Sequence, residues 1–230
     1  MGVRQKKKLA PAVAALDPGW MAWLQTNQTE TFRRALQQHW LRHGLAQTVE
    51  DLIAPLSVRV GEAWQAGELS VFQEHLYSEV VQAVLREAMA AIDLRTDGAP
   101  RGPRVLLTTL PREQHALGLL MAECFLALEG CERRQLGVST PLAEIVNAAQ
   151  ALQADVVALS CSAQATAQDI LQSLRQLRAQ LPPGVAIWVG GSATVLHGRR
   201  LPEGIVAVRR APDLAPLVTA WRVQHVAGRP

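Results

Sequence analysis

The chain has 230 residues, of which 49% are hydrophobic, and a formal net charge of +3. This length allows one large domain or two smaller ones with buried cores, and the composition is typical of soluble globular proteins. No apolar run is long enough to cross a bilayer, and the basic N-terminus lacks the apolar core and cleavage site of a secretory signal. The three cysteines have no metal-ligand spacing, which fits a reduced cytoplasm.

The positive charge is concentrated at the start of the chain, at Arg4, Lys6, Lys7 and Lys8. Setting these four charges aside turns the net charge of +3 into −1 for the remainder. Such a tail can contact phosphates but reads no base sequence, and neither a basic recognition helix nor a zinc finger is evident. We therefore expect a disordered basic tail over residues 1–19 and no specific DNA binding by the chain alone.

Residues 20–96 have the apolar periodicity of helices, and we expect a four-helix bundle there. Pro55 falls inside the third helix and is able to kink it. Ser70 and Gln73 form a capping-box pattern at the start of the fourth. The predicted helices cover residues 20–25, 29–44, 49–67 and 70–94. The apolar residues whose helical spacing marks these helices are Phe32, Leu36, Trp40, Leu41, Val49, Leu52, Ile53, Leu56, Val60, Trp64, Val71, Leu76, Val80, Val84, Leu85 and Met89.

A linker rich in Gly and Pro is expected at 97–103, and a second domain at 104–230. In this domain short apolar runs alternate with helical segments, which indicates a Rossmann-like, doubly wound parallel sheet. The fold class is thus α followed by α/β. The predicted strands cover residues 105–110, 135–138, 155–159, 185–189 and 205–208. The predicted helices cover residues 118–128, 141–152 and 166–180, with a closing helix from residue 212.

Three loops of this second domain come directly after strand ends, at 113–118, 160–166 and 190–192. Ligands of doubly wound sheets bind beyond the carboxyl ends of the strands, so these loops predict a ligand site. The first loop carries Glu113, His115 and Gly118. A metal-ligating imidazole usually donates its other N–H to a carboxylate, which Glu113 can supply. The alternative is an ordinary surface histidine on a strand–helix loop.

The pattern Glu113-x-His115-x-x-Gly118 resembles the lower-ligand motif of cobalamin-binding domains, Asp/Glu-x-His-x-x-Gly. The resemblance implies that His115 is the lower axial ligand of cobalt, in place of the cofactor's own dimethylbenzimidazole. It also implies that Gln114 contacts the cofactor and that Gly118 lets the chain pass close under a bulky planar ligand. The implied channel for the buried nucleotide tail is lined by Ser160, Ser162, Thr166, Gly190 and Gly191.

Two features of this channel are open at the level of sequence. Ser162 stands where the family usually has Leu or Thr. Gly190 and Gly191 fit an ordinary turn as well as a channel wall. If they line the channel, we expect a bulky residue at either position to block the tail and leave the fold intact.

The helical half contains Trp64 and, ten residues later, Glu74 and His75. The plain interpretation is a core tryptophan and a helix-surface pair. However, Trp-x9-Glu-His resembles the upper-face signature of CarH-like regulators, and the two motifs occur in the family's order. This implies that Trp64, Glu74 and His75 cover the ligand above cobalt in adenosyl-, methyl- or hydroxocobalamin. Light-sensing members often have a His directly after the Trp. Here that residue is Gln65, which leaves His75 as a possible upper axial ligand.

CarH-like repressors begin with a MerR-type DNA-binding domain, for which we expect no room in this sequence. Its layout resembles that of AerR-like proteins, which consist of a stand-alone cobalamin-binding module. The resemblance implies a light-responsive, non-enzymatic transcription regulator that acts as an antirepressor on a partner repressor. The alternative is a corrinoid carrier of a methyltransferase system. A nucleotide- or flavin-binding module is less favoured because the first strand is not succeeded by a Gly-x-Gly-x-x-Gly loop. His39 and His43 could bind a metal but lack an evident third ligand.

Overall fold

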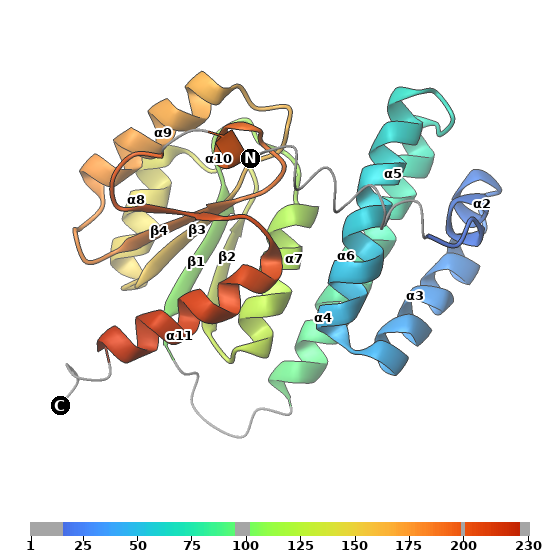
Figure 1. Cartoon of the computed structure of the whole chain (residues 1–230), viewed down its shortest axis with the longest axis horizontal. Helices are drawn as coiled ribbons and strands as arrows, with labels where there is room; N and C mark the ends of the chain where they lie inside the picture. The colour runs from blue at the N-terminus through green and yellow to red at the C-terminus, as the bar shows by residue number, and fades with distance from the viewer. Residues whose placement is uncertain (1–15, 95–101, 199–200, 226–230) are drawn as a thin grey trace. The chain divides into compact units, whose positions relative to one another are not determined.

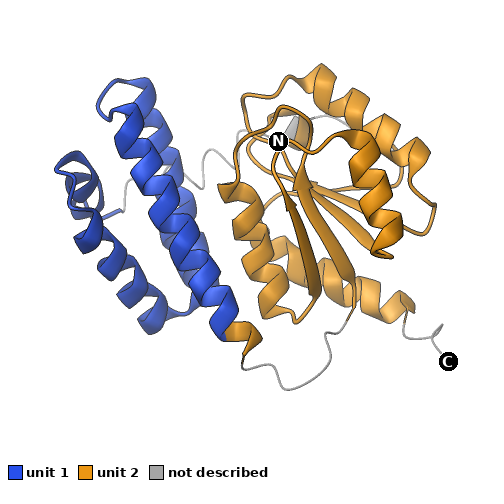
Figure 2. Cartoon of the chain, turned by 180° about the vertical axis from the view of Figure 1, so that it is seen from behind, with its two compact units in different colours: residues 1–91 blue, residues 92–230 orange. Residues whose placement is uncertain are grey.

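A computed structural model describes residues 16–94, 102–198 and 201–225. The chain divides into two compact units, residues 1–91 and 92–230 (Figure 2). Residues 1–15 of the expected tail and residues 95–101, which include most of the expected linker, lie outside the described residues. Within the part that is described, no helix is long and apolar enough to span a membrane.

The first unit consists of helices, as predicted (Figure 1). They are α2 (Gly19–Gln25), α3 (Thr29–His43), the consecutive segments α4 (Leu45–Gln47), η1 (Thr48–Ile53) and α5 (Ala54–Gln65), and α6 (Val71–Asp93). The segment η1 is a π-helix, and Pro55 lies in the first turn of α5 directly after it. Proline has no N–H to donate, so the wider turn before it is a physical way to fit Pro55 into a continuous helical stretch.

Aromatic and aliphatic side chains from α3, α5 and α6 form the core of this unit. Tyr77 is fully buried, and its hydroxyl lies 2.6 Å from Oγ of Ser57. Burial raises the pKa of Tyr77, so the phenol stays neutral and joins α6 to α5. Each large side chain buried in this way contributes roughly 1.5–3 kcal/mol. The largest fully buried side chains of the unit are Tyr77, Phe32, Leu36, Ile53, Leu56 and Leu85.

Four of the apolar residues that mark the predicted helices lie outside the core. Leu41 is 74% exposed, and Trp64, Val71 and Leu76 are also exposed. On α6 the buried face is instead set by Tyr77, together with Val81 and other residues at helical spacing. Leu76 precedes Tyr77 by one residue, and one step along a helix turns the side chain by about 100° away from the core.

The start of α6 is held by the predicted pair of Ser70 and Gln73. The backbone N–H of Ser70 donates to Oε1 of Gln73 over 2.9 Å, which is one half of a capping box. The amide nitrogen of Gln73 then donates to the carbonyl oxygens of Leu24 and Gln25, at 3.2 and 3.0 Å. Gln73 therefore also ties α6 to the end of α2.

The second unit contains a five-stranded, all-parallel sheet, which confirms the predicted fold class. Its strand order, β2-β1-β3-β4-β5, is that of a doubly wound sheet whose topological switch point lies between β1 and β3. The strands are β1 (Arg104–Thr109), β2 (Glu132–Gly137), β3 (Val156–Ser160), β4 (Ala186–Gly190) and β5 (Ile205–Val208).

Helices cover both faces of this sheet (Figures 1 and 2). Helix α8 (Leu142–Ala151) packs with α9 (Ala167–Gln180), and α7 (Leu117–Leu128) packs with α11 (Leu214–His225). Because both faces are buried, the central strands are continuously apolar rather than alternating. Two short elements were not predicted, the helix α10 (Val195–Gly198) and the 3-10 turn η2 (Ala211–Asp213) before α11.

Candidate functional site

The loop between β1 and α7 carries the first motif, at the carboxyl end of the sheet. Glu113 is buried, and its Oε1 lies 2.6 Å from Nδ1 of His115. The same oxygen accepts the backbone N–H of His115 at 3.0 Å, and Oε2 accepts the backbone N–H of Ser162 at 2.7 Å. The carboxylate therefore holds the histidine on one side and the loop after β3 on the other, across the switch point.

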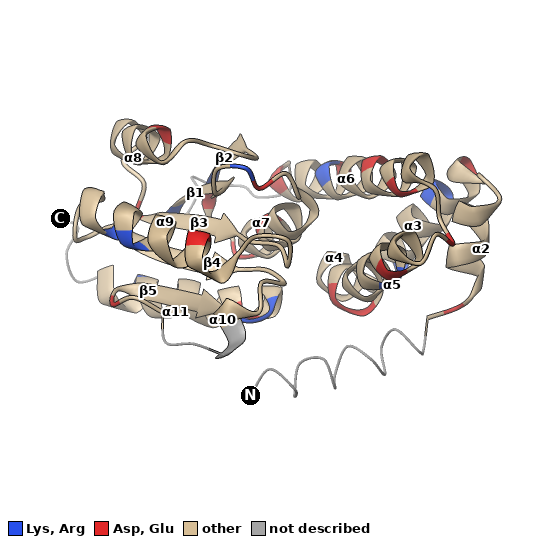
Figure 3. Cartoon of the chain, turned by 90° about the horizontal axis from the view of Figure 1, so that it is seen from above, with Lys and Arg blue, Asp and Glu red and all other residues tan. Residues whose placement is uncertain are grey.

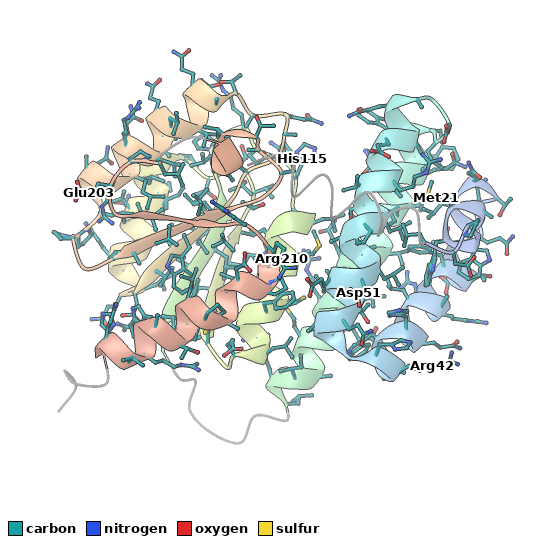
Figure 4. All side chains as sticks on the ribbon, viewed as in Figure 1. Met21, Arg42, Asp51, His115, Glu203 and Arg210 are labelled. Carbon is teal, nitrogen blue, oxygen red and sulfur yellow. The ribbon has the colours of Figure 1, made fainter. Side chains whose placement is uncertain are left out.

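The ionisation of Glu113 determines the tautomer of His115. Burial alone raises the pKa of Glu113, but the hydrogen bonds from Ser162 and His115 outweigh it, so the pKa of Glu113 lies below its usual value. An ionised carboxylate only accepts hydrogen bonds, so Nδ1 of His115 carries a proton, and the lone pair of the neutral imidazole lies on Nε2. The His115 side chain, labelled in Figure 4, is 51% exposed, so a metal can reach its imidazole.

Gly118 has a role that the sequence did not reveal. A Cβ atom at this position would lie 2.7 Å from Oγ of Ser160, at the end of β3. Gly118 therefore lets the first turn of α7 pack against Ser160. Ser160 is buried, with 8% of its surface exposed. A ligand that reaches its hydroxyl could use it as a hydrogen-bond donor or acceptor.

The hydroxyl groups of Ser162 and Thr166 are engaged within the chain. Oγ of Ser162 accepts the backbone N–H of Gln164 at 3.3 Å, while its own backbone N–H donates to Glu113. Thr166 caps α9: its Oγ1 accepts the N–H of Asp169 at 3.1 Å. Such a cap stabilises a helix by about 1 kcal/mol. That these two side chains also line a tail channel stays a prediction.

Gly190 and Gly191 are required by the fold itself, which corrects the expectation that bulky residues there leave the fold intact. Gly191 has φ +115°, and a Cβ atom on it would overlap the carbonyl oxygen of Cys161. A Cβ atom on Gly190 would lie 3.0 Å from the carbonyl oxygen of Val208. The loops after β3 and β4 thus meet backbone to backbone.

Burial raises the pKa of the Cys161 thiol to about 12, so it is protonated and unreactive at neutral pH.

In the helical unit Trp64 is not a core residue. It continues the buried stripe of α5 that includes Leu56 and Val60, but it is 41% exposed in the last turn. Glu74 and His75 lie in the first turns of α6. Oε1 of Glu74 accepts the hydroxyl of Ser78 at 2.8 Å, and the His75 side chain is 71% exposed. All three signature side chains are thus accessible to a ligand, and their contact with a cofactor stays a prediction.

The other proposed sites receive less support. His39 and His43 lie close, with ring centroids 4.4 Å apart, but Nδ1 of His39 is 3.0 Å from Oγ1 of Thr48. No group of three His, Cys, Asp or Glu side chains able to hold a metal occurs in residues 16–94, 102–198 and 201–225. Gln114 is exposed beside His115, and within the described residues its side chain makes no hydrogen bond or ion pair.

The loop contains a further buried polar residue that the sequence analysis missed. Thr109 ends β1, is fully buried and is hydrogen-bonded to the backbone of Glu113. A polar residue at the end of an otherwise apolar strand was the available signal, since a buried hydroxyl requires a partner.

Two family models described as "B12 binding domain" match the chain, one over residues 103–216 and the other over residues 26–88. The chain belongs to the B12-binding family. Cobalamin is thus its cofactor, as the motifs predicted. The donor set fits this cofactor, because the imidazole of His115, held by the carboxylate of Glu113, would offer a nitrogen donor to its metal. The hydroxyl of Ser160, packed against Gly118 at the same edge of the sheet, would add a polar contact.

The chain is similar to two curated proteins of Myxococcus xanthus. The HTH-type transcriptional repressor CarH is 38% identical over 148 residues, which cover 64% of this chain and 48% of CarH. The HTH-type transcriptional repressor CarA is 31% identical over 194 residues, which cover 80% of this chain and 63% of CarA. The matched region thus spans about half of one relative and less than two thirds of the other. The expected likeness to CarH-like proteins is confirmed.

The fold is also that of a solved corrinoid protein. The Methanosarcina barkeri monomethylamine corrinoid protein superimposes with a TM-score of 0.66 at 14% identity, covering 88% of this chain and 96% of that chain. This likeness shows a common arrangement of helices and parallel sheet.

Proposed function

We propose that this B12-binding protein is a light-responsive regulator of transcription in the cytoplasm that acts on a partner repressor and catalyses no reaction. The observation that carries the proposal is the exposed upper-face signature Trp64…Glu74-His75, in a chain whose curated relatives are transcriptional repressors. Bound cobalamin supplies a weak cobalt–carbon bond that light can break. The protein's residues hold the cofactor and convert loss of its upper ligand into a changed surface.

The α/β unit would hold the cofactor from below. Nε2 of His115 would bind cobalt, because Nδ1 is occupied by Glu113. The hydroxyl of Ser160 would accept or donate a hydrogen bond to the buried part of the nucleotide tail. These groups are arranged before the cofactor binds, so little ordering is required on binding.

The helical unit would respond to the upper ligand. Trp64 offers a large flat surface to a bulky upper group such as adenosyl, and the carboxylate of Glu74 can accept a hydrogen bond from a ribose. When that group is lost, Trp64 and His75 lose their contact. A regulatory switch of this kind needs an element with two arrangements whose balance the ligand alters.

A protein partner fits this chain better than DNA. Arg residues are interspersed with Asp and Glu over both units (Figure 3), and the largest excess of positive charge on a described element is on α3, with three Arg and one Glu. Phosphate binding draws its affinity from many neutralised charges, which so small an excess does not supply. We therefore propose that the helical unit contacts a repressor and relieves its repression.

A corrinoid carrier is the second candidate, since the solved corrinoid protein has a similar fold. A carrier leaves the upper face open to a methyltransferase, whereas Trp64 and His75 would cover it. The deciding experiment records absorption spectra of protein loaded with adenosyl-, methyl- and hydroxocobalamin before and after green light. We expect light to convert the alkylated forms, with a matching change in the protein's affinity for a co-encoded repressor or in its oligomeric state. Methyl transfer from an added methyltransferase, without a light response, would overturn the regulator in favour of the carrier.

A further inference from the structure

The hydroxyl of Thr109 joins two neighbouring loops at the carboxyl edge of the sheet. It donates to the carbonyl oxygen of Glu113 over 2.7 Å and accepts the backbone N–H of Ser139, also over 2.7 Å. Glu113 lies in the loop after β1, and Ser139 lies in the loop after β2. Thr109 is fully buried, so both bonds are protected from competition with water.

A second bond links the same loops. Oγ of Ser139 accepts the backbone N–H of Arg112 at 3.0 Å. Arg112 has φ +69° and Ser139 has φ +58°, so both residues adopt the left-handed conformation that favours glycine. Residues with side chains persist there only when their surroundings hold them, and such residues cluster at functional sites.

The sheet is distorted at this point. Leu107 of β1 pairs with Gln135, but Thr108 pairs with Gly137, so Leu136 is an extra residue in β2. A bulge of this kind bends a strand and redirects the loop after it, and bulges are frequent beside active sites. Here it precedes Ser139 by three residues, where the loop turns back to the end of β1.

Glu113 is consequently held from two directions. Thr109 fixes its carbonyl group, and the N–H of Ser162 fixes its carboxylate. We propose that Thr109 is a positioning residue for His115: through Glu113 it sets the imidazole before cobalamin binds. This inference rests on the proposed role of His115 as lower cobalt ligand. Within the described residues the hydroxyl of Thr109 is bonded to Glu113 and Ser139 and not to the imidazole, so it would act through Glu113.

The test compares Thr109→Val with Thr109→Ser, and with Thr108→Val as a matched control. Valine keeps the shape of threonine and removes the hydroxyl, whereas serine restores it. Thr108 is equally buried. Its hydroxyl donates to the carbonyl oxygen of Gly137 over 3.0 Å and to Oγ1 of Thr140 over 2.7 Å, but within the described residues it has no hydrogen bond to Glu113. The measurements are the hydroxocobalamin dissociation constant, its spectrum in the protein and the urea unfolding of the apoprotein.

We expect Thr109→Val to weaken binding by about 10–100-fold, as for groups that orient a metal ligand, and to lower the fraction of cobalt with histidine bound. Thr109→Ser should restore the wild-type spectrum. Thr108→Val should lose stability but keep the wild-type spectrum. A wild-type spectrum and affinity in Thr109→Val, or an equal spectral change in Thr108→Val, would overturn the inference.

Two further variants keep the test decisive. If Thr109→Val does not fold, Thr109→Ala removes the same hydroxyl without a branched side chain: a lower histidine-bound fraction than in Thr109→Ser supports the inference, and an equal one rejects it. His115→Ala separates the two proposals. If His115→Ala retains the wild-type spectrum, the assignment of His115 as ligand is wrong. If His115→Ala loses the spectrum of histidine-bound cobalt but Thr109→Val keeps it, only the positioning role of Thr109 is rejected.

Discussion

Oε1 of Glu113 lies 2.6 Å from Nδ1 of His115, so a buried carboxylate decides which ring nitrogen of the histidine faces outward. Nδ1, the ring nitrogen that contacts Glu113, is thereby excluded from metal binding. The same contact restricts rotation of the imidazole, which is 51% exposed on its loop. The pair therefore determines how the α/β unit presents a nitrogen donor to the cofactor.

His115→Ala should abolish the spectrum of histidine-bound cobalt. It should also lower cobalamin affinity by more than about 10–100-fold, the loss typical of residues that only orient a metal ligand. The reason is loss of the only axial donor assigned to the α/β unit. Titration of hydroxocobalamin into the variant gives both quantities. His43→Ala, which removes an exposed histidine of α3, is the control and should behave as wild type. Unchanged spectra in His115→Ala would end the assignment.

Glu113→Gln should weaken binding about 10–100-fold with the ligand still present. A glutamine amide offers one oxygen where the carboxylate offers two, so either His115 or Ser162 loses its acceptor. Equilibrium binding measured beside His115→Ala should place this variant between the wild type and the alanine variant.

The same variant should change the pH dependence of stability. The pKa of Glu113 is lower in the folded chain than its usual value near 4.5, so the unfolded chain takes up the proton first as the pH falls. The stabilising contribution is complete above the usual pKa and is lost as the pH falls through the lower, folded value. Urea unfolding of wild type and Glu113→Gln should differ by a constant amount near neutral pH and converge in acid. A difference that does not change in acid would contradict this.

Gly191→Ala should destabilise the α/β unit and not merely close a channel. The backbone strain of a side chain at φ +115° costs about 1–3 kcal/mol, and the overlap with the Cys161 carbonyl adds to it. Thermal unfolding of the apoprotein measures the loss. Gly184→Ala is the control, because a Cβ atom there meets nothing within 4 Å. A variant as stable as wild type that fails to bind cobalamin would instead favour a purely channel-lining role.

His75→Ala should change the spectrum of hydroxocobalamin-loaded protein if His75 becomes the upper ligand after loss of the alkyl group. Gln65 stands where light-sensing relatives often have a His, and the His75 side chain is exposed and available. The variant should also exchange added imidazole or cyanide faster than wild type. Identical spectra and exchange would reject His75 as a ligand, leaving water on cobalt and a cap formed by Trp64 and Glu74.

DNA binding by the isolated protein should be weak and steeply dependent on salt. Four positive charges lie within residues 1–8, so deletion of this segment should remove most of the binding. Mobility-shift assays at two salt concentrations, with specific and unrelated DNA, provide the measurement. A salt-resistant shift on one promoter only would contradict the proposal that a repressor is the target.

The order of elements, the strand ends that carry the loops and the Glu113–His115 motif could all be predicted from the sequence, because periodicity and local spacing encode them directly. The errors lie where position around a helix matters. Leu41 and Leu76 have apolar side chains at plausible spacings, but the packing of neighbouring helices turned them outward. Trp64 continues an apolar stripe, and its exposure argues against the alternative of a core tryptophan.

The residues that meet across the switch point could not be predicted in this way and depend on the folded arrangement. Ser162 reaches Glu113 from 49 residues away, and Thr109 joins loops that come after different strands. Gly118 makes room for Ser160, and Gly191 faces the Cys161 backbone, whereas the sequence indicated space for a ligand. The physical reason is that such contacts depend on the lateral order of strands and on a bulge in β2, neither of which is encoded in local spacing.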